Sequence, residues 1–535
     1  MLGQMMKLPL TIPSLLEFAA RFHGNGEIVS KTVEGPIHRY NFAALARRAK
    51  QLANALRSLG IGDGDIVGTL AWNGYRHLEL YYGVCGVGAV CHTVNPRLFP
   101  EQIAYIINHA EDRYVFTDLT FVKLLEGLAD KLKKVRGFVI LTDRANMPST
   151  TLPNVLCYEE LLAGQPDTFD WRILDENSAA GLCYTSGTTG NPRGVLYSHR
   201  STVLHSFAVL FADAFALTAR DAILPVVPMF HVNAWGIPHA APISGCKIVM
   251  PGPHLDGASL TSLMEEEGVT ISAGVPTVWL GLLAQIKETG KCPSRLNRVV
   301  IGGSACPPAM MEAFEKLGVR VIHAWGMTEM SPLGVINSPT RATEALSAAE
   351  KAAATLKQGR PLYGVDIKIV DPQGKELPFD GTSFGSLKVR GYWICDSYFR
   401  QEPVAAHAEA GWFDTGDVAT IDSEGFIKIV DRTKDVIKSG GEGISSIDLE
   451  NIAVAHPAVR EAAAIARADE KWGERPVIVA VLKPGAVATA EEIRAFYRGK
   501  VGKWCEPDAV IIVDSLPHTA TGKLLKTELR RLYGG

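Results

Sequence analysis

The stretch Tyr184-Thr-Ser-Gly-Thr-Thr-Gly-Asn-Pro-Arg-Gly-Val195 constrains this chain more than any other. It follows an apolar run, residues 179–183, that is typical of a buried strand. Three glycines let backbone N–H groups approach a ligand closely: Gly187, Gly190 and Gly194. The hydroxyl and cationic side chains of the stretch belong to Thr185, Ser186, Thr188, Thr189 and Arg193. Glycines, hydroxyls and a cation directly after a strand predict a cradle for phosphate oxygens.

The spacing of this stretch separates it from two other phosphate-binding loops. It does not fit the Gly-x-x-x-x-Gly-Lys-Ser/Thr pattern of the P-loop, and it does not fit the Gly-x-Gly-x-x-Gly pattern of dinucleotide-binding folds. A flexible surface loop is the alternative interpretation of a tract rich in serine, threonine and glycine. The motifs that follow along the chain favour phosphate binding.

The stretch resembles the phosphate-binding signature of the adenylate-forming superfamily, which includes acyl-CoA synthetases, nonribosomal peptide adenylation domains and luciferases. The resemblance implies an enzyme that uses ATP to convert a carboxylic acid into an acyl-adenylate and pyrophosphate. Most members then pass the acyl group to a thiol. These enzymes usually have lysine at the position of Arg193. Arginine keeps the positive charge but donates hydrogen bonds from a planar guanidinium group instead of a single ammonium group. We therefore expect phosphate binding to be kept and somewhat altered.

Composition limits the class of protein. A chain of 535 residues with 47% hydrophobic and 21% charged residues is typical of a globular enzyme with two or more domains. A formal charge of −3 without a dense basic face argues against nucleic acid as a partner. The nine cysteines include no C-x-x-C pair, which favours a reducing, cytoplasmic location. No export signal is visible at the start, and the most apolar window, residues 81–94, is too short to span a membrane.

The order of apolar runs predicts an α/β fold. Residues 42–59 form one apolar helical face, with Asn41 as its cap and Gly60 at its end. Short strands are expected at 65–71, 114–117, 138–142, 223–227, 247–250, 269–273, 298–301 and 319–323. Helices alternate with several of them, which indicates parallel sheets covered on both faces, with ligands beyond the strand carboxyl ends.

Three changes in the pattern divide the second half of the chain. Residues 340–357 are charged and alanine-rich, which predicts an exposed helical insertion. Short β-like runs from Val365 onward predict a β subdomain. We expect an N-terminal adenylation domain over 1–433 and a small mobile α+β domain over 434–535, with a hinge at Lys434.

Several further motifs match the superfamily within the large domain. The segment Pro228-Met-Phe-His231 resembles its aromatic or histidine gate beside the carboxylate, and Gly302-Gly303-Ser304-Ala305 resembles its adenine-binding turn. The match Trp325-Gly326-Met327-Thr328-Glu329 implies that Trp325 stacks on adenine, that Thr328 contacts the α-phosphate and that Glu329 holds Mg²⁺, a cation that prefers carboxylate and phosphate oxygens. His323 and Ala324 precede this motif at the nucleotide site, and the acyl pocket is expected to include His231, Val232, Trp235, Gly236, Gly303, Met327 and Met330.

Two more motifs lie nearer the C-terminus. Asp417 in Gly-Trp-Phe-Asp-Thr-Gly-Asp matches the carboxylate that accepts from the ribose hydroxyls, and Arg432 matches the ribose-contacting arginine. Lys523 lies in a Pro-His-Thr-Ala-Thr-Gly-Lys loop like that of the catalytic lysine. A cation is needed there because a carboxylate must attack an α-phosphate, which is also an anion. The resemblance thus implies that Lys523, His231, Thr185 and Glu329 take part in the reaction itself.

The segment 438–443 departs from the pattern of its own branch. It resembles the loop that shapes the thiol tunnel after domain rotation, and its candidate cofactor-binding residues are Lys438, Gly440, Gly441 and Gly443. In the medium-chain fatty-acid and methylthiopropanoate CoA ligases, the branch that this chain most resembles, tryptophan occupies the position of Gly443. The segment Trp504-Cys505-Glu506-Pro507 also departs from an expected aromatic and apolar pair. We hypothesise that the glycine widens the tunnel or weakens CoA binding.

These motifs agree in order and cover nearly the whole chain, which predicts an AMP-forming acyl-CoA synthetase for a short- to medium-chain acid, dependent on ATP, Mg²⁺ and coenzyme A. Three alternatives stay open: a methylthiopropanoate-specific CoA ligase, an adenylating enzyme with an amine or another thiol as acceptor, and a non-catalytic nucleotide- or acyl-binding protein on the same fold. Family habit suggests a homodimer through the large domain.

Overall fold

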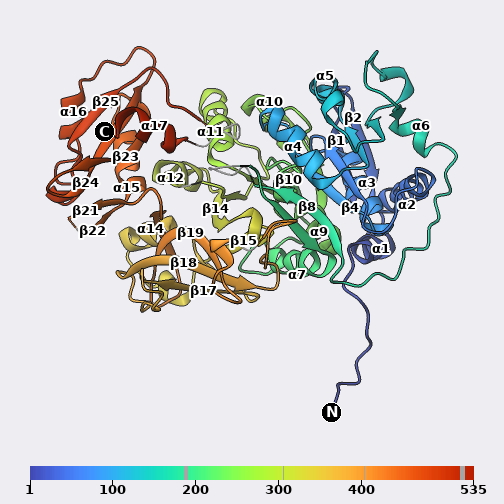
Figure 1. Cartoon of the computed structure of the whole chain (residues 1–535), viewed down its shortest axis with the longest axis horizontal. Helices are drawn as coiled ribbons and strands as arrows, with labels where there is room; N and C mark the ends of the chain where they lie inside the picture. Colours follow the sequence, from blue (N-terminus) through green and yellow to red (C-terminus); the bar gives the residue numbers. More distant parts are fainter. Residues whose placement is uncertain (186–190, 305, 403, 441, 519–523, 535) are drawn as a thin grey trace. The chain divides into compact units, whose positions relative to one another are not determined.

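The computed structural model describes residues 1–185, 191–304, 306–402, 404–440, 442–518 and 524–534. Contacts between residues divide the chain into two compact units (Figure 1). Unit 1 contains the described residues up to Asp366 together with Arg390–Val404. Unit 2 contains Ile367–Val389 and the described residues from Ala405 onward. The predicted division at Lys434 stays a prediction.

The first sheet of unit 1 has the strand order β7-β6-β5-β3-β4-β8-β9. Its strands are β7 (Val155–Cys157), β6 (Gly137–Ile140), β5 (Tyr114–Thr117), β3 (Ile66–Leu70), β4 (Val90–Thr93), β8 (Ala179–Tyr184) and β9 (Gly194–Ser198). Neighbouring strands are parallel up to β8, whereas β9 runs antiparallel to β8. The predicted phosphate stretch therefore begins at the carboxyl end of a parallel strand.

The second sheet of unit 1 has the order β16-β15-β14-β13-β12-β10-β11-β1-β2. Its strands are β16 (Arg360–Pro361), β15 (Leu333–Ile336), β14 (Arg320–Gly326), β13 (Arg298–Ile301), β12 (Ile271–Gly274), β10 (Ala222–Pro225), β11 (Lys247–Met250), β1 (Glu27–Lys31) and β2 (Ile37–Asn41). The strands from β14 to β1 are parallel, with antiparallel neighbours at both edges. The predicted α/β class with parallel sheets is confirmed.

Helices connect these strands. In unit 1 they are α1 (Ile12–Phe22), α2 (Phe42–Ser58), α3 (Tyr75–Gly86), α4 (Pro100–Ala110), α5 (Val122–Glu126), α6 (Tyr158–Leu162), α7 (His199–Leu210), α8 (Val232–Trp235), α9 (Ile237–Ser244), α10 (Gly257–Glu266), α11 (Pro276–Thr289), α12 (Pro308–Lys316), α13 (Arg341–Glu344) and α14 (Ala348–Leu356). The helix α2 begins at the predicted residue, where Asn41 Oδ1 accepts from the N–H of Ala44 (2.9 Å). It ends one residue earlier than predicted, and Gly60 takes the expected left-handed conformation with a φ of +73°.

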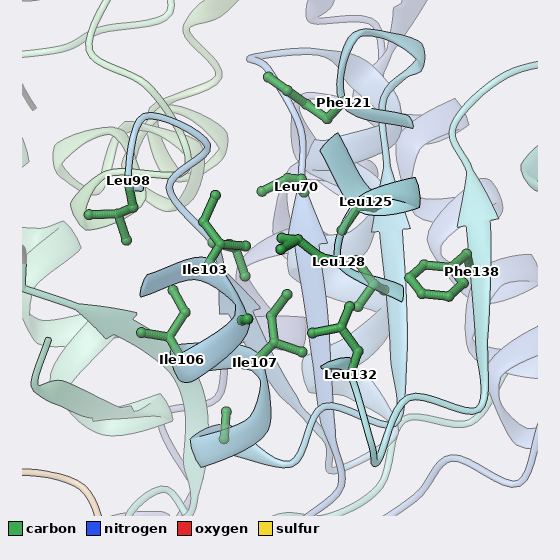
Figure 2. Packing of buried hydrophobic residues seen from close by; sticks show 14 of the residues in the cluster. Leu70, Leu98, Ile103, Ile106, Ile107, Phe121, Leu125, Leu128, Leu132 and Phe138 are labelled. Atoms are coloured by element: carbon green, nitrogen blue, oxygen red, sulfur yellow. The ribbon is translucent and has the colours of Figure 1, made fainter. Parts of the chain in front are cut away.

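A hydrophobic core packs between α4, α5 and the first sheet (Figure 2). Ile103 and Ile107 from α4 lie beside Leu70 of β3 and Leu125 of α5, and all four side chains are fully buried. Burying an aliphatic side chain of this size contributes about 1.5–3 kcal/mol to the free energy of folding. This cluster therefore stabilises the strands of the first sheet and the loops that follow their carboxyl ends. A helix long and apolar enough to cross a bilayer does not occur in the described part of the chain.

Unit 2 contains most of the sheet β17-β18-β19-β20 and all of a second sheet, β22-β21-β24-β23, in which β25 also pairs with β24. The strands are β17 (Val365–Val370), β18 (Phe384–Gly391), β19 (Phe413–Ile421), β20 (Ile427–Arg432), β21 (Ile437–Ser439), β22 (Glu442–Ile444), β23 (Val459–Asp469), β24 (Gly473–Leu482) and β25 (Ala509–Ile512). The helices are α15 (Ser446–Val454), α16 (Ala490–Ala495) and α17 (Lys526–Tyr533). The predicted β subdomain and α+β region are both present.

Candidate active site

The phosphate stretch joins β8 to β9. The N–H of Thr185 donates to the carbonyl oxygen of Arg193 (2.8 Å), which closes the base of the loop. A Cβ at Gly194 would lie 3.1 Å from Phe399 Cβ and 3.2 Å from the Tyr184 ring, so only glycine fits without a shift. The predicted phosphate contacts Ser186, Gly187, Thr188 and Thr189 lie outside the described residues. Of the predicted phosphate contacts, Thr185 and Arg193 lie within the described residues, one on each side of the loop.

Thr328 and Glu329 form a buried short turn just after β14. Glu329, 6% exposed, accepts a hydrogen bond at Oε1 from the Tyr398 hydroxyl (2.7 Å), and its carbonyl oxygen accepts from the N–H of Cys395 (2.8 Å). The Tyr197 hydroxyl donates to the carbonyl oxygen of Thr328 (2.6 Å). The turn is thus held by hydrogen bonds from Tyr197, which precedes it in the sequence, and from Cys395 and Tyr398, which follow it.

The strand that leads into this turn carries the predicted nucleotide contacts. A Cβ at Gly326 would lie 1.8 Å from the carbonyl oxygen of Pro332, so the position requires glycine. Trp325 is half-buried with its ring against Gly334, and Ala324 and Met327 are also half-buried. His323 Nδ1 lies 3.1 Å from the carbonyl oxygen of Lys357, and burial lowers the pKa of His323 to about 4, so its imidazole is neutral. Met330, predicted at the acyl pocket, is fully buried.

The predicted adenine turn follows β13, next to β14. Gly303 has a φ of +83°, and a Cβ there would lie 3.1 Å from Val275. A Cβ at Gly302 would lie 3.1 Å from the carbonyl oxygen of Ala324 and 3.4 Å from the end of the Trp235 indole. Ser304 is exposed, and Ala305 lies outside the described residues. The small residues therefore allow close packing of backbone between the adenine turn and the predicted acyl wall.

His231 precedes a left-handed turn. Four consecutive non-glycine residues, Val232 to Trp235, have φ values between +47° and +57°. Gly236 follows at +77°, and a Cβ there would lie 2.7 Å from the ring of His205. This conformation is costly for L-residues. The only local sequence signals for it are an asparagine and a glycine, which tolerate positive φ.

The loop before His231 is held by two residues of the α3 region that sequence reasoning missed. The Asn73 side chain donates to the carbonyl oxygens of Pro225 (2.8 Å) and Val227 (3.0 Å) and accepts from the N–H of Met229 (2.6 Å). The Tyr81 hydroxyl donates to the carbonyl oxygen of Met229 (2.6 Å). Neither residue belongs to a local motif, so only the fold reveals their role.

In unit 2, Asp417 and Arg432 are brought together across β19 and β20. The two residues are paired in register, and Arg432 Nε lies 2.7 Å from Asp417 Oδ1. Asp417 is 2% exposed, whereas the Arg432 side chain is 44% exposed. The pair thus presents a buried carboxylate under a guanidinium that solvent or a ligand can reach. Burial and neighbouring cations lower the pKa of Lys434, two residues further on.

Segment 438–443 forms a hairpin in unit 2, with Lys438 paired to Gly443. The N–H of Lys438 donates to Glu474 Oε2 (2.7 Å). Gly440 has a φ of +61°, and a Cβ there would lie 2.9 Å from the Trp472 ring. A Cβ at Gly443 would lie 3.1 Å from Val436 and 3.3 Å from the Phe384 ring. Gly441 and the predicted catalytic Lys523 lie outside the described residues.

Comparison with protein families identifies the chain. The model of the AMP-binding enzyme family matches residues 16–399, and that of the AMP-binding enzyme C-terminal domain matches residues 448–523. The chain belongs to the AMP-binding enzyme family. The predicted membership of the adenylate-forming superfamily is therefore confirmed, and the first match spans the phosphate stretch, the adenine turn and the Thr328-Glu329 turn.

Individual AMP-binding enzymes resemble the chain over its full length. A medium-chain-fatty-acid–CoA ligase of Ectopseudomonas oleovorans is 52% identical over 100% of this chain and 98% of its own. A 3-methylmercaptopropionyl-CoA ligase of Ruegeria lacuscaerulensis is 51% identical over 99% and 98%. The crystal structure of the anthranilate CoA ligase AuaEII with anthranoyl-AMP has a TM-score of 0.86 at 24% identity and 98% coverage of both chains, which supports the fold. The predicted enzyme class, an AMP-forming acid–thiol ligase, agrees with these names.

Proposed function

We propose that this chain is an ATP-dependent acyl-CoA synthetase that activates a short- to medium-chain carboxylic acid through an acyl-adenylate. In the first step a carboxylate oxygen attacks the α-phosphorus of ATP and pyrophosphate leaves. In the second, the sulfur of coenzyme A attacks the acyl carbon and AMP leaves. The names of the relatives at 52% and 51% identity support this reaction. They also favour a medium-chain fatty acid or 3-methylmercaptopropionate as the acid.

One observation carries the proposal. The buried Thr328-Glu329 turn is tied by Tyr398 to the segment that also contacts the phosphate stretch, since the N–H of Phe399 donates to the carbonyl oxygen of Gly194 (2.8 Å). Two motifs far apart in the sequence are thus fixed to one short segment by protein hydrogen bonds. This is the preorganisation that charge stabilisation during phosphoryl chemistry requires.

Mg²⁺ fits Glu329, since a buried carboxylate supplies the hard oxygen ligand that this ion prefers. Among the described residues, no group of three or more histidine, cysteine, aspartate or glutamate side chains is placed to hold a metal. Phosphate oxygens of the nucleotide and water would be the other ligands of an ion held there. When bound, the ion would neutralise phosphate charge. The hydrogen bond from the Tyr398 hydroxyl keeps the Glu329 carboxylate in position.

The remaining site residues divide by substrate. For phosphate we propose Thr185, Ser186, Gly187, Thr188, Thr189, Arg193 and Thr328; for adenine Gly303, Ser304, Ala305, His323, Ala324, Trp325, Gly326 and Met327; for ribose Asp417 and Arg432. For the acid we propose His231, Val232, Trp235, Gly236, Gly303, Met327 and Met330, and for coenzyme A Lys438, Gly440, Gly441 and Gly443. Lys523 would neutralise the two anions in the first step, and a hinge at Lys434 would exchange it for the 438–443 hairpin.

We also propose a cytoplasmic homodimer formed through the large domain. Large apolar side chains are exposed on the N-terminal segment (Met1, Leu2, Met5, Met6 and Leu8), on α1 (Phe18 and Phe22), on α7 (Phe207) and at the residue that follows α7 (Phe211). Contiguous exposed apolar surface marks interaction sites, and these side chains are our candidates for such a surface. Sedimentation of the pure protein would test the state of assembly.

A second function, adenylation with an amine or another thiol as acceptor, is favoured by one observation: position 443 is a glycine and presents no side chain. Pyrophosphate release and acyl product should be measured for straight-chain, branched and thioether acids, each with and without coenzyme A. The proposed ligase requires turnover that depends on coenzyme A and yields a thioester. Pyrophosphate release without any thioester would contradict it and favour the second function.

A further inference from the structure

The left-handed turn after His231 is an unusual piece of backbone. Val232, Asn233, Ala234 and Trp235 have φ values of +47°, +51°, +47° and +57°. Asn233 and Ala234 have ψ values of 44° and 42°, so these two residues are in the left-handed helical conformation. Residues other than glycine and asparagine avoid this region, and a run of them persists only where surrounding structure imposes it.

The side chain of Asn233 connects the turn to neighbouring elements of the fold. Its side-chain oxygen lies 3.1 Å from the Tyr81 hydroxyl, 3.4 Å from Thr93 Oγ1 and 3.4 Å from Cys183 Sγ. Tyr81 belongs to α3, Thr93 to β4 and Cys183 to β8, the strand that leads into the phosphate stretch. One carboxamide thus links the turn to a helix and to two neighbouring parallel strands.

The same turn is closed locally and packed at both ends. The carbonyl oxygen of Pro228 accepts from the N–H groups of His231 (3.0 Å) and Ala234 (3.2 Å). At the far end, the indole of Trp235 lies against Gly302 of the adenine turn, and Gly236 lies against the ring of His205. His205 is fixed in turn, because its Nε2 accepts from the N–H of Leu333 (3.3 Å). The positions of His231 and Trp235 are therefore coupled through the backbone between them.

We propose that this turn is a preformed wall that sets the acyl chain-length preference, and that Asn233 is its positioning residue. The inference rests on the proposed function, in which His231 and Trp235 line the acyl site. Loss of the Asn233 side chain frees the turn from α3, β4 and β8. Because the left-handed backbone is unfavourable by itself, Val232 to Trp235 then relax, and the wall no longer discriminates between acids that differ in length.

The test compares Asn233→Gly and Asn233→Ala with a matched control, Asn54→Ala. Glycine takes a positive φ without strain, so Asn233→Gly removes the tether but keeps a backbone that can fold. Asn54 is also half-buried, and its carboxamide donates to the carbonyl oxygens of Pro166 (2.9 Å) and Thr168 (3.0 Å), outside the proposed site. The measured quantities are KM and kcat for straight-chain acids of increasing length, and KM for ATP.

We expect both Asn233 variants to raise the KM for the preferred acid about tenfold, as for loss of one or two buried hydrogen bonds. The ratio of kcat/KM between long and short acids should move toward one, while KM for ATP stays within about twofold. Asn54→Ala should leave all of these values unchanged. An Asn233→Gly enzyme with the wild-type length profile, or an equal change in Asn54→Ala, would overturn the inference. Wild-type enzyme that produces neither pyrophosphate nor thioester would instead contradict the proposed function.

Discussion

The Tyr398 hydroxyl donates a 2.7 Å hydrogen bond to Oε1 of Glu329, and both side chains are buried. The guanidinium of Arg193 lies over the same tyrosine ring, 5.2 Å from its centre. One aromatic side chain therefore contacts the carboxylate proposed to hold Mg²⁺ and the cation proposed to hold phosphate. Its position makes the geometry of these two groups interdependent.

Replacing Tyr398 by phenylalanine removes the hydrogen bond and keeps the ring. A hydrogen bond to a charged group contributes about 1.5–3 kcal/mol, so we expect the apparent affinity for Mg²⁺ with ATP to fall tenfold or more. The KM for the acid should change little. Titration of Mg²⁺ against ATP binding by calorimetry measures this without turnover. The control is Tyr363→Phe, at an exposed tyrosine that pairs with Tyr392 (3.3 Å). Equal affinities in both variants would show that Tyr398 does not position Glu329.

The Asp417–Arg432 pair predicts a nucleotide defect. Asp417→Asn keeps the shape of the side chain but removes the charge that would accept from both ribose hydroxyls. Hydrogen bonds to a charged acceptor are about twice as strong as neutral ones, so ATP affinity should fall about tenfold or more. Asp508→Asn is the control within unit 2, since Asp508 also pairs with an arginine (Arg475, 2.8 Å). Equilibrium binding of ATP that is unchanged in Asp417→Asn would rule out the ribose role.

Phe384 occupies the space beside Gly443, so tryptophan at position 443 would press on its ring. Phe384 is 43% exposed and can move or be removed. If the glycine weakens CoA binding, the Gly443→Trp/Phe384→Ala pair should lower the KM for coenzyme A several-fold relative to Phe384→Ala alone, because a large contact surface is restored. The KM for ATP should stay constant. Unchanged CoA affinity and thioesterification rate would reject the hypothesis.

Buried histidines predict acid sensitivity. Burial lowers the pKa of both His205 and His239 to about 3. An unfolded histidine has its ordinary pKa near 6.5, so between about pH 6.5 and 3 the unfolded chain binds protons that the folded chain does not. The free energy of unfolding should therefore fall as pH decreases through this range, by up to about 1.4 kcal/mol per pH unit for each histidine. Urea unfolding at several pH values measures this slope.

His239→Leu supplies the matching test. This change removes one proton-binding group from the unfolded chain, so stability should depend less steeply on pH below about 6.5. His239 is flanked by the rings of Tyr81 (5.5 Å) and Tyr82 (5.8 Å), an environment that accepts an apolar side chain. The same slope in the variant and the wild type would mean that His239 is not the source of the acid sensitivity.

Periodic features of the fold were accessible from the sequence because they depend on local patterns. The strands at 114–117, 247–250 and 298–301 have the predicted bounds, since each is a short apolar run between polar turns. The cap at Asn41 and the exposed helices within 340–357 also agree with prediction. The first and last residues of the other strands differ from the predicted ones by one to three residues, because pairing with neighbouring strands decides where a strand ends.

The supporting residues of the candidate site were not accessible in this way. Tyr197, Tyr398, Asn73 and Tyr81 act through single hydrogen bonds to segments distant in sequence, and such contacts leave no local pattern. The left-handed turn was missed because valine, alanine and tryptophan avoid that conformation; tertiary packing overrides their preference. The motif residues themselves were recognised by resemblance, and their roles stay proposals.

The most direct test of the central claim follows the oxygen atoms of the acid. The enzyme is incubated with ATP, Mg²⁺, coenzyme A and a medium-chain acid carrying ¹⁸O in its carboxylate, and the products are analysed by mass spectrometry. Attack of the carboxylate on the α-phosphorus places one labelled oxygen between carbon and phosphorus, and this oxygen leaves with AMP when the thiol attacks the acyl carbon. AMP and acyl-CoA should therefore each carry one labelled oxygen, pyrophosphate should carry none, and the three products should form in equal amounts. Label in inorganic phosphate together with ADP, or AMP without label, would contradict the acyl-adenylate route.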